Sequence, residues 1–158
     1  MPGNDNDIIS IIDVNINRAL EGLRVCEDIT RFVFQNKKFT TKIKELRHLL
    51  LTLTSDISLS QRFTARDVQN DPTKFYNTSS EDDRTSIEDL FTTNIHRVTE
   101  AIRSLEESGK LLSLPSSKFQ EIRFSLYEIE KQVMSEYCRK FKIATMYDAL
   151  YAILDSQF

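Results

Sequence analysis

The chain has 158 residues, of which 40% are hydrophobic and 28% charged, and its formal net charge is −3. This balance is typical of one folded domain rather than a disordered chain, and the negative charge argues against a nucleic-acid partner. Three glycines and three prolines are too few for a turn-rich β-barrel, and no apolar run approaches the roughly 20 residues of a membrane span, so we expect helices and no membrane.

The first part of the chain predicts a helical hairpin. Apolar residues recur at three- and four-residue steps from a start near Asn6 or Asp7 through Phe34, which predicts one long helix. A second helix is predicted over about 40–55, antiparallel to the first because the connection is short. Its inward residues are expected to be Ile43, Leu46, Leu49, Leu50 and Leu53.

The segment from Asp56 to Arg84 is polar and shows no helical period. A connection of this length is unusual inside a compact domain, and long loops are generally functional or disordered. We favour a site on this loop, with plain disorder as the alternative. Asp67 and Asp71, two carboxylates four residues apart, give a weak signal for Mg²⁺.

The last part of the chain predicts a second hairpin. Ser86 with Asp89 three residues later predicts the start of a third helix over about 87–112. A break at 114–117 precedes a fourth helix over about 117–140. We take 1–142 as one helical domain and 143–158 as a tail, in which the apolar run 150–154 is either a last helical turn or a truncated strand.

A repeat relates the two hairpins. Lys42 to Arg47 returns as Lys118 to Arg123, a separation of 76 residues (118 minus 42). Within the first and third helices the separation is 79 residues (94 minus 15) at five positions. The sequence therefore predicts an all-α bundle built from a duplicated two-helix unit, about 8–55 and 87–140, related by an approximate two-fold axis around a long central loop. The five repeated residues are Asn15, Arg18, Glu21, Arg24 and Glu27, which return as Asn94, Arg97, Glu100, Arg103 and Glu106.

Arg18 and Arg97 are predicted to lie on the inward side of their helices. At about 100° per residue, each falls on a stripe that is otherwise small or apolar. Two interpretations stay open. Either the arginines pair with carboxylates such as Glu21 and Glu100 across the bundle, or they form an anion pocket, because a guanidinium matches phosphate oxygens bidentately.

Other residues carry weaker predictions. Gly22 costs about 1 kcal/mol of helix stability relative to alanine, which suggests that something approaches the first helix closely there. The charged residues within 24–31 occur at spacings that predict a solvated, salt-bridged face. Two roles stay open for Arg47 and His48: a structural role, which is the commoner case, and contact with a phosphate, which is the more specific hypothesis. The isolated cysteines predict small core residues and, with no signal peptide at the N-terminus, a cytoplasmic protein.

These motifs together resemble one family over about residues 11–134. They are the asparagine–arginine–glutamate pattern of 15–28, its second copy over 94–107, Arg47-His48, and Arg66-Asp67-x-x-x-Asp71. The chain is similar to the helical domain fused N-terminal to thiamine-phosphate synthase in some bacteria, a family associated with phosphorylation of hydroxymethylpyrimidine phosphate to its pyrophosphate. The tail from Leu150 to Ser156 resembles the opening strand of the synthase's (β/α)₈ barrel, and because no barrel follows, synthase activity is not expected.

The resemblance implies a kinase of thiamine biosynthesis that uses ATP and Mg²⁺ on a phosphorylated pyrimidine. A thiamine-phosphate synthase domain, in cis or in trans, would be its partner. The metal would be held by Asp67 and Asp71. Phosphates would be held by the catalytic candidates Arg18, Arg97, Arg47 and His48, and the substrate would be contacted by Asn15, Glu21, Gly22, Arg66, Asn94 and Glu100.

The alternative is a non-catalytic module that binds a phosphate ligand or oligomerises, for example as a homodimer. Such a module needs an exposed apolar surface. Phe63, Phe75 and Phe91 are the residues expected to supply it.

Overall fold

The computed structural model describes residues 5–67, 69 and 85–155, with side chains described as far as residue 140, and this part of the chain contains helices and no strand. The all-α prediction is confirmed. The elements are α1 (Asp5–Asp28) with a π-helical turn η1 (Ile29–Val33), α2 (Lys37–Leu53), α3 (Leu59–Ala65), α5 (Ile87–Ser108) with a 3₁₀ turn η2 (Gly109–Leu112), and α6 (Ser116–Asp155).

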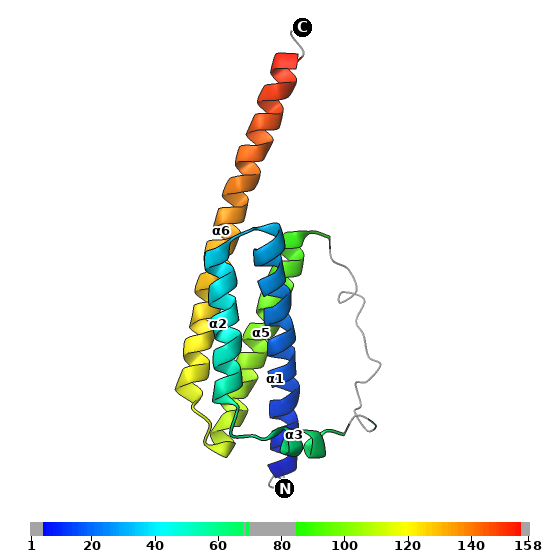
Figure 1. Ribbon diagram of the computed structural model, residues 1–158, viewed down its shortest axis with the longest axis vertical. Helices are drawn as coiled ribbons and strands as arrows, with labels where there is room; N and C mark the ends of the chain where they lie inside the picture. The colour runs from blue at the N-terminus through cyan, green and yellow to red at the C-terminus, as the bar shows by residue number, and fades with distance from the viewer. Residues whose placement is uncertain (1–4, 68, 70–84, 156–158) are drawn as a thin grey trace.

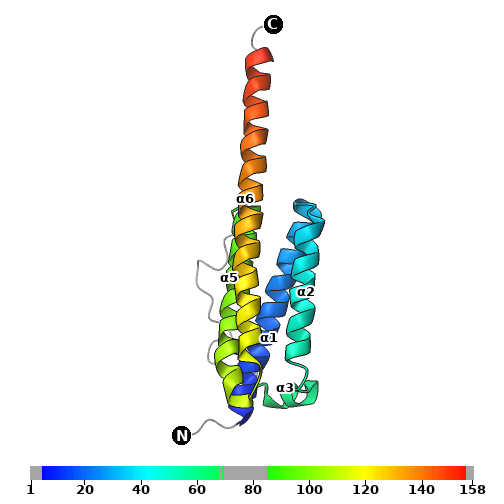
Figure 2. The same ribbon diagram turned by 90° about the vertical axis from the view of Figure 1, so that its left-hand side faces the viewer.

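The four long helices form a bundle in which α1 and α6 run one way and α2 and α5 run the other (Figure 1). The short helix α3 lies across the end of the bundle where α1 begins, and the last part of α6 extends beyond the opposite end (Figures 1 and 2). The helices that carry the repeated motif, α1 and α5, pack against each other. None of the described helices is long and apolar enough to cross a membrane.

Local capping sets where the helices begin. The Asn36 side chain accepts a hydrogen bond from the Phe39 backbone N–H at 3.2 Å and begins α2. Ser86 accepts from the Asp89 N–H at 3.1 Å, so the predicted start of the third helix is confirmed. Ser58 and its partner three residues on form a capping box that begins α3. The prediction that 56–84 lacks helix is therefore wrong for 59–65, and residues 68 and 70–84 lie outside the described residues.

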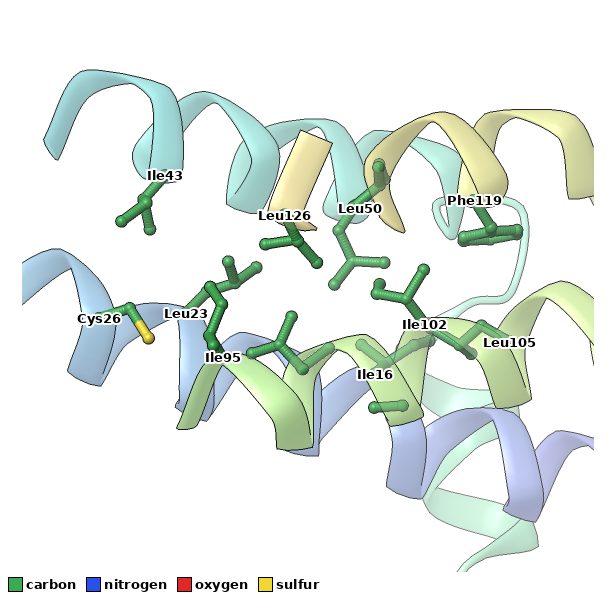
Figure 3. Packing of buried hydrophobic residues seen from close by; sticks show 14 of the residues in the cluster. Ile16, Leu23, Cys26, Ile43, Leu50, Ile95, Ile102, Leu105, Phe119 and Leu126 are labelled. Carbon is green, nitrogen blue, oxygen red and sulfur yellow. The ribbon is translucent and has the colours of Figure 1, made fainter. Parts of the chain in front are cut away.

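The core lies along the axis of the bundle and receives side chains from all four long helices (Figure 3). Each large apolar side chain that is fully buried contributes about 1.5–3 kcal/mol relative to its exposed state. Burial of this stripe from each helix positions α1 against α5. The fully buried residues include Ile16 and Leu23 from α1, Ile43 and Leu50 from α2, Ile95, Ile102 and Leu105 from α5, and Phe119 and Leu126 from α6.

Three expectations about single elements are corrected. The first helix reaches Val33 rather than Phe34, and from Ile29 it is π-helical rather than α-helical. Of the two alternatives for the run 150–154, the helical one is confirmed, because no glycine or proline interrupts α6. Leu49 is 36% exposed rather than inward, and Cys138 is exposed rather than part of the core.

The apolar surface expected from three phenylalanines is also corrected. Phe63 is 59% exposed, but Phe91 is fully buried against Phe34, with ring centroids 6.1 Å apart. Phe75 lies outside the described residues. Phe63 is therefore the one of the three that the described surface offers.

Candidate functional site

A cleft of about 460 Å³ lies between α1 and α5. Its volume falls within the roughly 300–1,000 Å³ of small-molecule sites. Both copies of the repeated motif contribute to it, so the structure brings five of the predicted site residues together. The lining residues are Asn15, Arg18 and Glu21 from α1 and Arg97, Glu100, Ala101 and Ser104 from α5.

The two arginines of the cleft are exposed, and within the described residues neither makes an ion pair. The expectation that Arg18 and Arg97 are inward is therefore wrong, and the expected pairing with Glu21 and Glu100 is not found there. All four charged side chains reach the cleft without a partner among the described residues. Their charges are available to a ligand that carries phosphate or a cation.

Asn15 and Asn94 make the same hydrogen bond at matched positions. The Asn15 Nδ2 donates to the Ile11 carbonyl oxygen, and the Asn94 Nδ2 donates to the Leu90 carbonyl oxygen, both at 2.8 Å. Both asparagines are buried. Asn15 lines the cleft, whereas Asn94 packs where α5 meets α1 and is not among the lining residues.

Gly22 marks the close approach of α5 to α1. A Cβ added at Gly22 would lie 2.6 Å from Val98 Cγ2 and 3.1 Å from the Asn94 carbonyl oxygen. The close approach expected at this glycine is therefore made by the neighbouring helix. Gly22 is not among the cleft-lining residues, and its small size sets how near the two helices lie.

Arg47 lies away from the cleft in an ion pair that joins α2 to α1. Its Nε donates to Glu27 Oε2 at 3.1 Å, and Arg24 lies 3.5 Å from the other oxygen. Glu27 is 5% exposed, so the solvated face predicted for 24–31 is wrong at this position. His48 is exposed on α2 and does not line the cleft. We name Arg24, Glu27 and Arg47 the Glu27 cluster.

The second copy of the motif has a matching Glu106 cluster of three residues. Arg123 Nε donates to Glu106 Oε2 at 3.1 Å, and Arg103 donates to Glu106 Oε1 at 2.7 Å. These residues occupy the positions that correspond to the Glu27 cluster under the two repeat separations. The duplication itself stays a prediction, but matched positions here have matched partners.

Arg66 lies at the end of α3, where it binds a buried carboxylate instead of facing the cleft. Arg66 Nε donates to Asp13 Oδ2 at 2.8 Å, and Arg62 Nε donates to Asp13 Oδ1 at 2.6 Å. Arg62 also donates to Asn17 Oδ1 at 3.0 Å, so α3 is held on α1 by three charge-assisted hydrogen bonds. Asp13 and Arg62 are not among the residues predicted from the sequence. A signal was present, because Asp13 stands beside the buried stripe of α1.

The predicted metal residues are not gathered in the described structure. Asp67 is exposed and has an interaction of its own, and Asp71 lies outside the described residues. Among the described residues, no group of three or more histidine, cysteine, aspartate or glutamate side chains could hold a metal ion.

Comparisons with known proteins agree on a family. Residues 10–132 match the ThiD2 family. The chain is 34% identical over 128 residues to the thiamine-phosphate synthase of Synechocystis sp. (strain ATCC 27184 / PCC 6803 / Kazusa), covering 80% of this chain and 36% of the relative. It is 34% identical over 156 residues to that of Prochlorococcus marinus (strain AS9601), covering 97% and 43%. The chain thus spans well under half the length of these relatives. No solved structure matches the chain.

Proposed function

This chain belongs to the ThiD2 family, and on that premise we propose that it is a phosphotransferase that converts hydroxymethylpyrimidine phosphate to its pyrophosphate with ATP. Relatives that are named thiamine-phosphate synthases support a role in thiamine biosynthesis. A pyrimidine pyrophosphate is the substrate that such a synthase consumes. A kinase that converts the monophosphate to the pyrophosphate would therefore supply the substrate of the synthase.

One observation carries the proposal. Arg18 and Arg97, one from each copy of the motif, line a single cleft and make no ion pair with the described residues. A guanidinium donates two parallel hydrogen bonds to a phosphate group, which holds the group in position as well as binding its charge.

The chemistry requires little more from the protein than position and charge. The acceptor is a phosphate oxygen, which is ionised at neutral pH and needs no general base. Catalysis then depends on holding two polyanions together and neutralising the charge that develops during transfer. A cleft lined by two arginines, with no histidine or cysteine among its lining residues, suits that task.

The donor set of the cleft also fits Mg²⁺. This ion is usually held by one or two carboxylates together with substrate phosphates, and Glu21 and Glu100 are the two carboxylates of the cleft. When bound there, the metal would neutralise negative charge on the phosphates. A contribution from Asp67 and Asp71 stays a prediction.

The arginine forks can be tested by substitution. Arg18→Lys and Arg97→Lys keep the charge but lose the second hydrogen bond, so turnover should fall by roughly ten- to a thousandfold, equivalent to about 1.4–4 kcal/mol of transition-state stabilisation. Arg31→Lys, an exposed arginine that does not line this cleft, is the matched control and should retain activity. If Arg18→Lys and Arg97→Lys are as active as Arg31→Lys, the two cleft arginines do not contribute to turnover through their second hydrogen bond.

The decisive experiment incubates the protein with ATP, Mg²⁺ and hydroxymethylpyrimidine phosphate and detects the pyrophosphate by mass spectrometry. Unphosphorylated hydroxymethylpyrimidine should be a poor substrate, because the arginines would lack their partner. The proposal fails if no product forms under conditions in which an authentic kinase makes it.

A non-catalytic module of a synthase is the second candidate. It is favoured by the length of the relatives, of which the chain covers 36% and 43% in the two cases above. This candidate predicts that the monophosphate binds without turnover, or that light scattering finds a stable dimer that has no activity. Calorimetry, light scattering and the kinase assay on one preparation distinguish the two.

A further inference from the structure

The cleft is not symmetric, although the motif that lines it is repeated. Asn15 lines it, but the matched Asn94 does not. Ser104 of α5 lines it, but the matched position on α1 holds Val25, which packs against the core. The second difference has a cause in the sequence, because serine and valine occupy the matched positions, whereas Asn15 and Asn94 are identical and differ only in where packing places them.

The residue pairs at the two ends of the α1–α5 contact also differ. Near Asn94, the close contact between Gly22 and Val98 fills the space between the helices. The positions that match this pair on the opposite helices are Ala101 and Ala19, so a methyl group replaces the hydrogen of Gly22 and another replaces the branched side chain of Val98. Ala101 lines the cleft together with Ser104, whereas Gly22 and Val98 are not among the lining residues.

Asn15 presents an oriented hydrogen-bond acceptor to the cleft. Asn15 is 6% exposed as a residue, and its Nδ2 donates to the Ile11 carbonyl oxygen. That bond sets the orientation of the amide and leaves Oδ1 without a donor among the described residues. The hydroxyl of Ser104 is likewise without a hydrogen bond there. Asn15 Oδ1 is not among the described buried side-chain polar atoms that lack a partner, so it is reached from the cleft, where a ligand can supply the donor.

We infer that the Asn15–Ser104 end of the cleft reads the hydrogen-bonding edge of a heterocycle, with Asn15 Oδ1 accepting from a ring amino substituent while the arginines hold the phosphate. The ligand class is an aminopyrimidine phosphate. This assignment rests on the proposed function, and it makes Asn15 and Ser104 specificity residues. An oxo group at the same ring position would place an acceptor against an acceptor and be rejected.

Binding without ATP tests this inference separately from turnover. Calorimetry would compare hydroxymethylpyrimidine phosphate, which carries the ring amino group, with its oxo analogue. The wild-type protein should prefer the amino compound by roughly ten- to a hundredfold, and Asn15→Leu and Ser104→Val should each reduce that preference at least severalfold. Inorganic phosphate, which contacts only the arginines, should bind all variants equally.

Asn94→Leu is the matched control. It removes the same buried hydrogen bond from α5 without altering a lining residue, so it should lower thermal stability as Asn15→Leu does and leave the preference unchanged. If Asn15→Leu does not fold, the half-buried Ser104 still provides the test through Ser104→Val. No preference in the wild-type protein, or the same preference in Ser104→Val, overturns the inference. Preference without turnover overturns the proposed kinase and leaves this assignment standing.

Discussion

Gly22→Ala offers a direct test of the packing that forms the cleft. Two opposing effects act at this position. Alanine stabilises a helix interior by about 1 kcal/mol relative to glycine. The added Cβ would lie 2.6 Å from Val98 Cγ2, a distance at which atoms must move.

The sign follows from what can move. Val98 is fully buried and its γ-methyl is held by a branched, stiff side chain, while the second neighbour is the Asn94 backbone oxygen at 3.1 Å. Overpacking a well-packed core costs about 1–3 kcal/mol. Taking about 2 kcal/mol for the overpacking and subtracting about 1 kcal/mol for helix propensity leaves about 1 kcal/mol of destabilisation. For a chain of this size that lowers Tm by about 2–4 °C.

A double-mutant cycle isolates the contact. Val98→Ala alone removes two buried carbons and should cost at least about 1.6 kcal/mol, at about 0.8 kcal/mol per carbon. In that background the clash with Val98 is absent, so Gly22→Ala should become neutral or stabilise by up to about 1 kcal/mol. The free energy of unfolding of all four proteins would be measured by urea denaturation followed by circular dichroism.

The change of sign between backgrounds is the critical result. If Gly22→Ala stabilises the wild-type protein by about 1 kcal/mol, helix propensity alone governs this position and α5 does not approach as closely as described. If the effect is the same in both backgrounds, Val98 is not the residue that Gly22 accommodates.

The remaining predictions concern buried polar groups. Glu27→Gln and Glu106→Gln should each lower the free energy of unfolding by about 1–3 kcal/mol in urea titrations, because each leaves a partly buried arginine, Arg47 or Arg123, without its carboxylate. A cost below about 0.5 kcal/mol would show that the clusters are solvated. Asp13→Asn should loosen α3 and raise amide hydrogen exchange there while α5 stays protected, and uniform exchange would contradict a local role. In the native protein a thiol reagent should modify the exposed Cys138 and not Cys26, because burial raises the pKa of the Cys26 thiol from 9.0 to about 12. Equal labelling of both cysteines would show that Cys26 is accessible. The pKa of the Cys26 thiol is higher in the folded state, so this thiol favours the folded state below pH 9, and its contribution is lost as the pH rises from about 9 towards 12. Over that interval the Cys26→Ala variant should therefore lose less stability than the wild-type protein.

The sequence alone determined the class of the fold and the helices that carry the cleft. Helical periodicity and caps are local properties, so the positions near Ser86 that begin α5 could be read without a structure. The repeat indicated that Arg18 and Arg97 do equivalent work. It could not show that they share one cleft, because that depends on how α1 crosses α5.

Only the tertiary structure decided which charged residues face a ligand and which face each other. Arg47 and Arg66 resemble Arg18 in the sequence, but Glu27 and Asp13 bind them at the interfaces of α2 and α3 with α1. Ion pairs of this kind join positions 20 and 53 residues apart, and no helical period specifies such a partner. A charge is left for a ligand only where packing brings no opposite charge within reach, and packing is a property of the assembled bundle.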